Sequence, residues 1–239
     1  MKQSSQTSLM HEKMAVGICL ALAGGFLDAY TYLLRGGVFA NAQTGNIVLF
    51  GIHLAKQEWL NALYCFVPIL AFFLGVLMTE FVKLKCTARE MITEHHVVLA
   101  VEAVFLFVIG WLPENVPNSF VNVSISFVCS LQVNSFRKIA EVPCATTMCT
   151  GNLRSTAEQF FRLLAFGERE AGVKCLRYVG IILAFTVGAG GGALLARQYG
   201  GRSIWICSGL FLAVLCLLLW DSRRRRTELS LSGQYNDGK

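Results

Sequence analysis

One motif occurs twice in this chain, and both copies occupy the same place in a longer pattern. Thr44-Gly45-Asn46 returns as Thr150-Gly151-Asn152, 106 residues further on. Each copy follows a long apolar segment with a carboxyl or amide side chain in its second half. These side chains are Asp28 and Asn134, which are also 106 residues apart. Two further apolar segments follow each copy. The pattern indicates two copies of one apolar unit.

The composition places these units in a membrane. Of 239 residues, 54% are hydrophobic and 15% are charged, against roughly 45–50% and about 25% in soluble domains. The charges cluster between long apolar windows, which is typical of spans joined by short loops. The net charge of +6 predicts no nucleic-acid partner, because its densest run, residues 223–226, directly follows an apolar segment. Such a run favours an anchor on anionic lipid, so the predicted partner is the bilayer.

The apolar segments predict an all-α polytopic protein with six transmembrane helices. The expected spans are 14–34, 60–82, 97–111, 120–136, 173–196 and 204–220. The motifs lie in two other segments, 38–55 and 143–164, which are too apolar for surface loops and too polar for ordinary spans. We expect these two segments to be broken or re-entrant. The predicted divisions are a polar tail 1–13, a first repeat 14–112, a second repeat 113–222 and a basic, then polar and mobile, tail 223–239.

The distribution of Lys and Arg predicts the orientation. With a cytoplasmic N-terminus and six spans, seventeen of these residues fall on the inner side and four on the outer side. Inner loops carry an excess of Lys and Arg. We therefore expect both termini to lie in the cytoplasm.

Three spans per unit is an odd number, so the second unit is expected to lie inverted relative to the first. Inverted repeats build many secondary transporters, whose sites lie near the midplane where broken helices meet. If short helices start at Ile47 and Leu153, their free N–H groups create a donor-rich pocket for an anion or a polar solute. The alternative is that Thr-Gly-Asn caps helices at the membrane surface.

Asp28 is the most informative single residue, because a carboxylate near a helix centre costs about 2.5–3.5 kcal/mol on insertion scales. It is expected to bind a proton or cation, to pair with Arg35, or to be a neutral structural aspartate. Glu102 lies nearer a span end, where snorkelling to the interface is expected. The predicted solute pathway consists of Asp28, Asn41, Thr44, Gly45, Asn46, Asn134, Thr150, Gly151 and Asn152.

The sequence predicts no catalytic residue, metal site or cofactor. None of its nine cysteines forms a Cys-x-x-Cys pair, and His95-His96 is the one histidine cluster. The sequence also contains no Gly-x-Ser-x-Gly nucleophile motif and no phosphate-binding loop. We therefore expect a protein that is not an enzyme.

Two sequence stretches resemble the YoaK family of bacterial integral membrane proteins, a group with a domain of unknown function. The first covers residues 25–46 and includes both Asp28 and the first motif. The second covers residues 131–138 and 145–154. The resemblance implies a bacterial inner-membrane protein of about six spans and implies no substrate.

We predict a small secondary transporter for a polar or anionic solute or an ion. The alternative is a membrane structural or accessory protein that does not transport. A protein of six spans is small for a transporter that alternates its access between the two sides of the membrane. This small size favours a homodimer.

Overall fold

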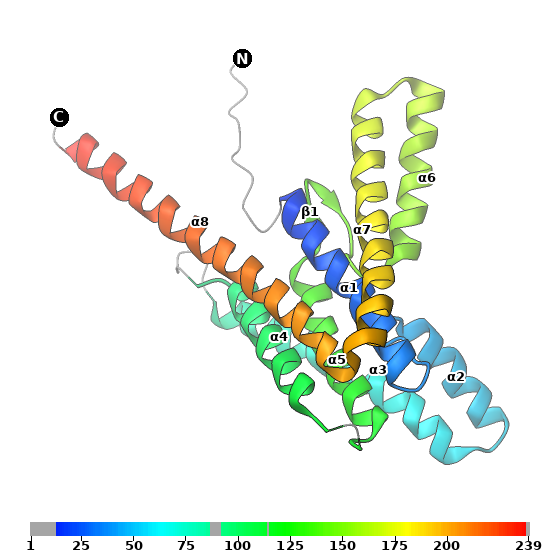
Figure 1. Cartoon of the computed structure of the whole chain (residues 1–239). Helices are drawn as coiled ribbons and strands as arrows, with labels where there is room; N and C mark the ends of the chain where they lie inside the picture. The colour runs from blue at the N-terminus through cyan, green and yellow to red at the C-terminus, as the bar shows by residue number, and fades with distance from the viewer. Residues whose placement is uncertain (1–12, 87–91, 114, 238–239) are drawn as a thin grey trace.

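The computed structural model describes residues 13–86, 92–113 and 115–237, and these form an almost entirely helical protein (Figure 1). The predicted tail 1–13 lies outside the described residues except for Lys13. The elements in chain order are α1 (Met14–Leu34), α2 (Gln43–Ala55), α3 (Trp59–Lys85), α4 (Glu94–Trp111), α5 (Asn118–Ser135), β1 (Lys138–Ile139), β2 (Val142–Pro143), α6 (Cys149–Phe166), α7 (Arg169–Tyr199), the 3-10 turn η2 (Gly200–Ile204) and α8 (Trp205–Asp237).

Helices occur where the six apolar segments predicted them, and the first helix has the predicted ends. Helix α8 continues beyond the sixth predicted span, through the arginine run, to Asp237. The strands β1 and β2 form a two-residue antiparallel hairpin. This hairpin was not predicted, and its turn has left-handed backbone at Ala140 and Glu141.

Four described stretches are long and apolar enough to cross a membrane: Met14–Leu34, Trp59–Lys85, Glu94–Trp111 and Arg169–Arg225. The last contains α7, η2 and the part of α8 that ends at Arg225. Helix α5 does not qualify because it is rich in Asn and Ser. Those polar groups bond inside the protein: Ser126 donates to the Ala40 carbonyl at 2.9 Å. Because α5 is largely buried, it needs no apolar surface toward lipid.

Helix α3 shows the burial pattern of a membrane protein. Its buried residues include Ala62, Ala71 and Gly75, all of them small. Its large apolar side chains, such as Phe73 and Phe81, are exposed. Small residues at helix contacts and large apolar residues facing outward are typical of helices packed within lipid. Together with the long apolar stretches, this pattern identifies an integral membrane protein.

The helices pack in two similar sets. Helix α1 packs on α7, and α5 packs on α3; α6 lies on α7, and α2 lies on α3. Helices α4 and α8 pack on each other (Figure 1). The two helices approach closely at Gly188 and Gly192 of α7, because a Cβ at Gly188 would collide with the carbonyl of Leu22 and a Cβ at Gly192 with the backbone of Phe26. The contact between α1 and α7 therefore brings the two backbones together without intervening side chains.

The expectation for Glu102 is wrong. Its side chain is fully buried in α4, and neither carboxyl oxygen has a hydrogen-bond partner among the described residues. Helix α4 packs between α5 and α8 at this level. Burial by neighbouring helices therefore prevents the side chain from reaching the interface.

Candidate functional site

The second half of α1 holds the start of α2 beside Asp28. The Asp28 carboxylate accepts from the backbone N–H of Asn41 at 3.1 Å. The Asn41 amide donates to the carbonyl of Gly24 at 3.1 Å. The chain folds back to make these contacts at Gly36 and Gly37, both with positive φ, a conformation that glycine adopts without strain. Asp28 is thus a buried acceptor that fixes the connection to α2.

The corresponding connection to α6 is held by different side chains. The Gln132 amide donates to the Thr146 hydroxyl at 2.7 Å, and Tyr178 donates to the Pro143 carbonyl at 2.9 Å. At the start of α6, the Asn152 amide donates to the carbonyl of Ala145 at 2.8 Å. These contacts fix residues 143–148 against α5 and α7, so α6 begins at a defined position.

The two Thr-Gly-Asn motifs are not broken segments. The predicted helix starts at Ile47 and Leu153 are wrong, because α2 begins at Gln43 and α6 at Cys149. Each motif therefore occupies the first turn of a helix. Neither N-cap residue makes a side-chain capping bond. Within the described part of the chain, no partner is recorded for the backbone N–H groups of Thr44 and Thr150.

The two helix starts meet at one cavity of about 1080 Å³. Many of its lining residues form pairs 106 positions apart, one from each half of the chain. These pairs are Asp28 and Asn134, Phe39 and Ala145, Asn41 and Thr147, Ala42 and Met148, Gln43 and Cys149, and Thr44 and Thr150. We call this space the Asp28 cavity. Residues at equivalent positions of the sequence repeat therefore line the same cavity.

Two buried polar atoms in the cavity wall lack partners. Asn41 and Thr147 are each 8% exposed, and neither Asn41 Oδ1 nor Thr147 Oγ1 has a hydrogen-bond partner among the described residues. Buried polar atoms are normally satisfied by protein or ordered water. Because these two atoms lie at equivalent positions, both halves of the chain leave hydrogen-bonding capacity at the same place.

The charges around the cavity differ between the two halves. The first half supplies the carboxyl group of Asp28, and the second supplies Arg137 and Arg154. The alternative of an Asp28–Arg35 pair is wrong, because Arg35 bonds to the Tyr30 hydroxyl at 3.2 Å. The cavity therefore has an acidic wall and a basic wall.

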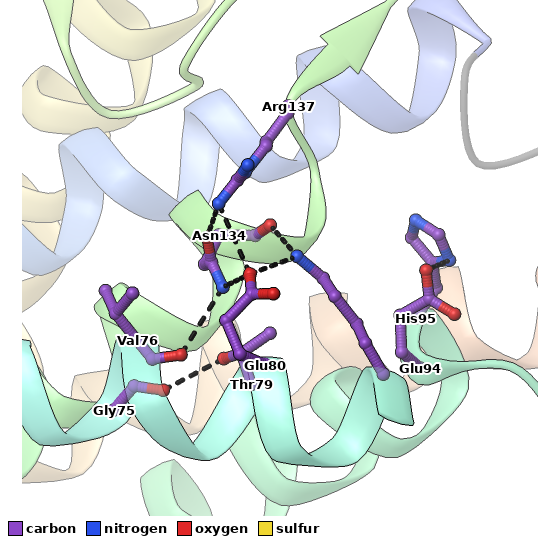
Figure 2. A network of polar contacts seen from close by, with 9 residues as sticks. Gly75, Val76, Thr79, Glu80, Glu94, His95, Asn134 and Arg137 are labelled. Atoms are coloured by element: carbon purple, nitrogen blue, oxygen red, sulfur yellow. Dashed lines mark hydrogen bonds and ion pairs between the residues drawn. The ribbon is translucent and has the colours of Figure 1, made fainter. Parts of the chain in front are cut away.

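Asn134 is held at the edge of the cavity by a polar network (Figure 2). Its side-chain amide donates to Glu80 at 2.7 Å, and its backbone carbonyl oxygen accepts from Lys83 at 2.9 Å. Arg137 contacts both Asn134 and Glu80. This network connects α3 to the end of α5, so Asn134 holds helices together as well as lining the cavity.

Most of the predicted pathway residues meet here. Those that line the cavity are Asp28, Asn41, Thr44, Asn134, Thr150, Gly151 and Asn152. Gly45 and Asn46 do not line it; the Asn46 amide instead donates to Gln43 at 2.9 Å. The sequence analysis did not include Thr147, Arg137 and Arg154 among the site residues. Thr147 could have been predicted, because it lies 106 residues after Asn41, the spacing of the repeat. The repeat spacing could not have predicted Arg137 and Arg154, because the positions 106 residues earlier carry no arginine. Within the described ranges, no group of three or more His, Cys, Asp or Glu side chains is placed to hold a metal ion.

The fold and the site define a polytopic α-helical integral membrane protein with a cavity lined by residues from both halves of the chain. The family model "Protein of unknown function (DUF1275)" matches residues 16–217, so the chain belongs to that family. It is 28% identical over 193 residues to the UPF0700 transmembrane protein YoaK of Bacillus subtilis (strain 168). The match covers 78% of this chain and 85% of that protein. No solved structure matches. The YoaK-family resemblance is confirmed.

Proposed function

We propose that this protein is a secondary permease for a small polar or anionic solute, with its site in the Asp28 cavity. The observation that carries the proposal is the meeting of two uncapped helix starts, one from each half, around unpartnered buried polar atoms. Free N–H groups and the positive end of the helix dipole favour anionic or electron-rich groups. Arg137 and Arg154 in the cavity lining add positive charge to the same space.

An inverted repeat with six spans is part of the proposal. It is supported by the packing, because exchanging the two halves turns the α1–α7 contact into the α5–α3 contact. It is also supported by direction: α2 runs toward the lower right of Figure 1, whereas α6 runs toward the top. The excess of Lys and Arg on one side supports cytoplasmic termini. With α2 only 13 residues long, at 1.5 Å per residue it is too short for a bilayer core of roughly 30 Å, which supports re-entry.

Asp28 is proposed as the single acidic group of the pathway. It is 8% exposed and lines the cavity, where the equivalent position in the second half carries an amide. A buried carboxyl group in the wall of a transport cavity is suited to carry a proton or to bind a cation. The permease is therefore proposed to couple solute movement to one such ion.

The alternative is a structural or accessory membrane protein. The hydrogen bonds from Asn41 to Asp28 and to Gly24 favour it, because they hold a loop against a helix. This function needs no water or solute in the cavity, which distinguishes it from a permease.

Thiol labelling tests the proposal. In a cysteine-free background, Thr44→Cys and Thr150→Cys are treated with a membrane-impermeant hydrophilic thiol reagent. The matched control is Val187→Cys, since Val187 is 65% exposed in the middle of α7 and lies outside the cavity lining. We expect both threonine variants to react much faster than the control, and a transported solute to protect both together. If both react as slowly as Val187→Cys, the cavity is closed to water and the permease proposal fails.

The variants Asp28→Asn and Asn152→Ala then test the pathway. Once a protecting solute is known, its uptake into proteoliposomes is expected to fall in both variants while expression and thermal stability stay normal. Normal transport by both would remove these residues from the pathway. Loss of stability without a specific loss of transport would favour the accessory function.

A further inference from the structure

A second cavity, of about 850 Å³, lies away from the Asp28 cavity. It is bounded by the end of α1, the end of α4, the connection into α5 and the turn η2. Its lining residues are Leu34, Arg35, Gly110, Trp111, Leu112, Pro113, Asn118, Tyr199, Gly200, Gly201 and Arg202. We call it the Arg35 cavity. It lies at the end of the bundle where α4 connects to α5 (Figure 1), the proposed outer face.

Arg35 in this wall is a buried cation with incomplete partners. The residue is 5% exposed. One guanidinium nitrogen donates to the Tyr30 hydroxyl at 3.2 Å, and the group lies 5.8 Å from the centre of the Tyr30 ring. Its Nε atom has no hydrogen-bond partner among the described residues. No ion pair to Arg35 is recorded within the described ranges. A buried charge without a counter-ion is costly.

Two local interactions stabilise the buried charge of Arg35 in part. Arg35 is the C-cap of α1, where the negative end of the helix dipole favours a cation. The Tyr30 hydroxyl in turn donates to the Gly201 carbonyl at 3.2 Å, which ties the guanidinium to η2. Both contacts hold Arg35 in place, but neither supplies a full negative charge.

The rest of the lining adds positive charge and donors. Arg202 from η2 is exposed and borders the same cavity. The Asn118 amide lies 3.6 Å from the Cβ position of Gly36, near the end of α1. The described lining contains no Asp or Glu. Guanidinium groups present forked donors that match phosphate oxygens. Two of them around one cavity match a group that carries one or two negative charges.

We propose that the Arg35 cavity binds a phosphate or phosphodiester group, held by Arg35 and Arg202. The group comes either from a free phosphate compound or from an anionic phospholipid headgroup. Binding supplies a counter-charge that the described lining residues do not provide. The site is separate from the Asp28 cavity and does not depend on the permease proposal.

The matched test pair is Arg202→Gln and Arg197→Gln. Both remove one charge from an exposed arginine. Arg197 lies in the last turn of α7 and Arg202 in the turn η2 that follows it, but only Arg202 lines the cavity. Purified protein in neutral detergent is dialysed to equilibrium against radiolabelled inorganic phosphate at constant ionic strength. In a second arm, protein is reconstituted in phosphatidylcholine with phosphatidylglycerol, extracted, and examined by native mass spectrometry for retained phosphatidylglycerol.

We expect saturable binding in at least one arm. Arg202→Gln should weaken it about tenfold or more, and Arg197→Gln should leave it unchanged. Binding in the first arm alone identifies a free phosphate ligand; binding in the second alone identifies a lipid headgroup. If neither ligand binds the wild type, or if both variants weaken binding equally, the proposal is overturned. Because neither arm measures transport, these outcomes are independent of the permease test.

Discussion

The close contact between α1 and α7 gives a prediction that compares two glycines of one helix. A Cβ at Gly188 would collide with the backbone carbonyl of Leu22, whereas a Cβ at Gly190 meets nothing within 4 Å. Replacing either residue by Ala gains the same helix propensity, roughly 0.8–1.0 kcal/mol, so this contribution cancels. The remaining difference is overpacking against a backbone that cannot rotate away. We therefore expect Gly188→Ala to be less stable than Gly190→Ala by about 1–3 kcal/mol.

The assay is thermal unfolding in detergent, followed by tryptophan fluorescence. For a chain of this size, each kcal/mol shifts Tm by roughly 2–4 °C, so the two variants should differ by several degrees. Gly192→Ala should behave like Gly188→Ala, because its Cβ would lie 2.8 Å from the Phe26 Cα atom. Equal Tm values for Gly188→Ala and Gly190→Ala would refute the packing of α1 on α7.

Three further predictions concern single positions. Glu102→Gln should keep or raise Tm and Glu102→Lys should abolish folded protein, as judged by size-exclusion chromatography, because a fully buried position tolerates an amide better than a charge. Gly151→Ala should keep Tm, since its Cβ meets nothing within 4 Å, yet reduce solute transport severalfold by narrowing the cavity. A lowered Tm would instead make Gly151 structural. The hydrogen bond from His53 lowers the pKa of the Glu58 carboxyl, so this pair stabilises the α2–α3 connection above the unfolded pKa of about 4.3 and stops doing so as pH falls through the lower folded pKa. The protection of the Glu58 amide, measured against the exchange rate of an unstructured chain at the same pH, should therefore fall as the pH drops below the unfolded pKa, and unchanged protection there would contradict the pair.

The helices could be predicted because a membrane makes the sequence signal simple. Some apolar segments are bounded by charged residues. For example, the segment between Lys13 and Arg35 predicts both ends of α1 correctly. The conformation of the motifs could not be predicted in the same way. Gly45 looked like a helix breaker, but it lies in a first helical turn. The chain reverses earlier, at Gly36 and Gly37, where φ is positive. A glycine alone does not say whether it breaks a helix or begins one.

The composition of the cavity was predictable only where the repeat applied. Asp28, Asn134 and the two motifs were found because they recur at one spacing. Arg137 has no equivalent arginine in the first half and reaches the cavity only through the packing of α5 on α3. Glu102 was misjudged for a related reason: its depth in the span was estimated along one helix, whereas its burial depends on the neighbouring helices α5 and α8.

The two halves of the chain supply different charged groups to the Asp28 cavity, and this difference bears on the proposed mechanism. If the permease alternates by exchanging the conformations of its two repeats, the backbone states on either side of the membrane are related by symmetry. The side chains are not, because Asp28 is on one wall and Arg137 and Arg154 are on the other. A solute would therefore meet an acidic wall from one repeat and a basic wall from the other in both states. Replacing Asp28 by Asn would make the position match Asn134. We expect that change to remove ion coupling, measured as the dependence of uptake on a pH gradient, while solute protection of Thr150→Cys persists. Persistence of the pH-gradient dependence in Asp28→Asn would place the coupling group elsewhere.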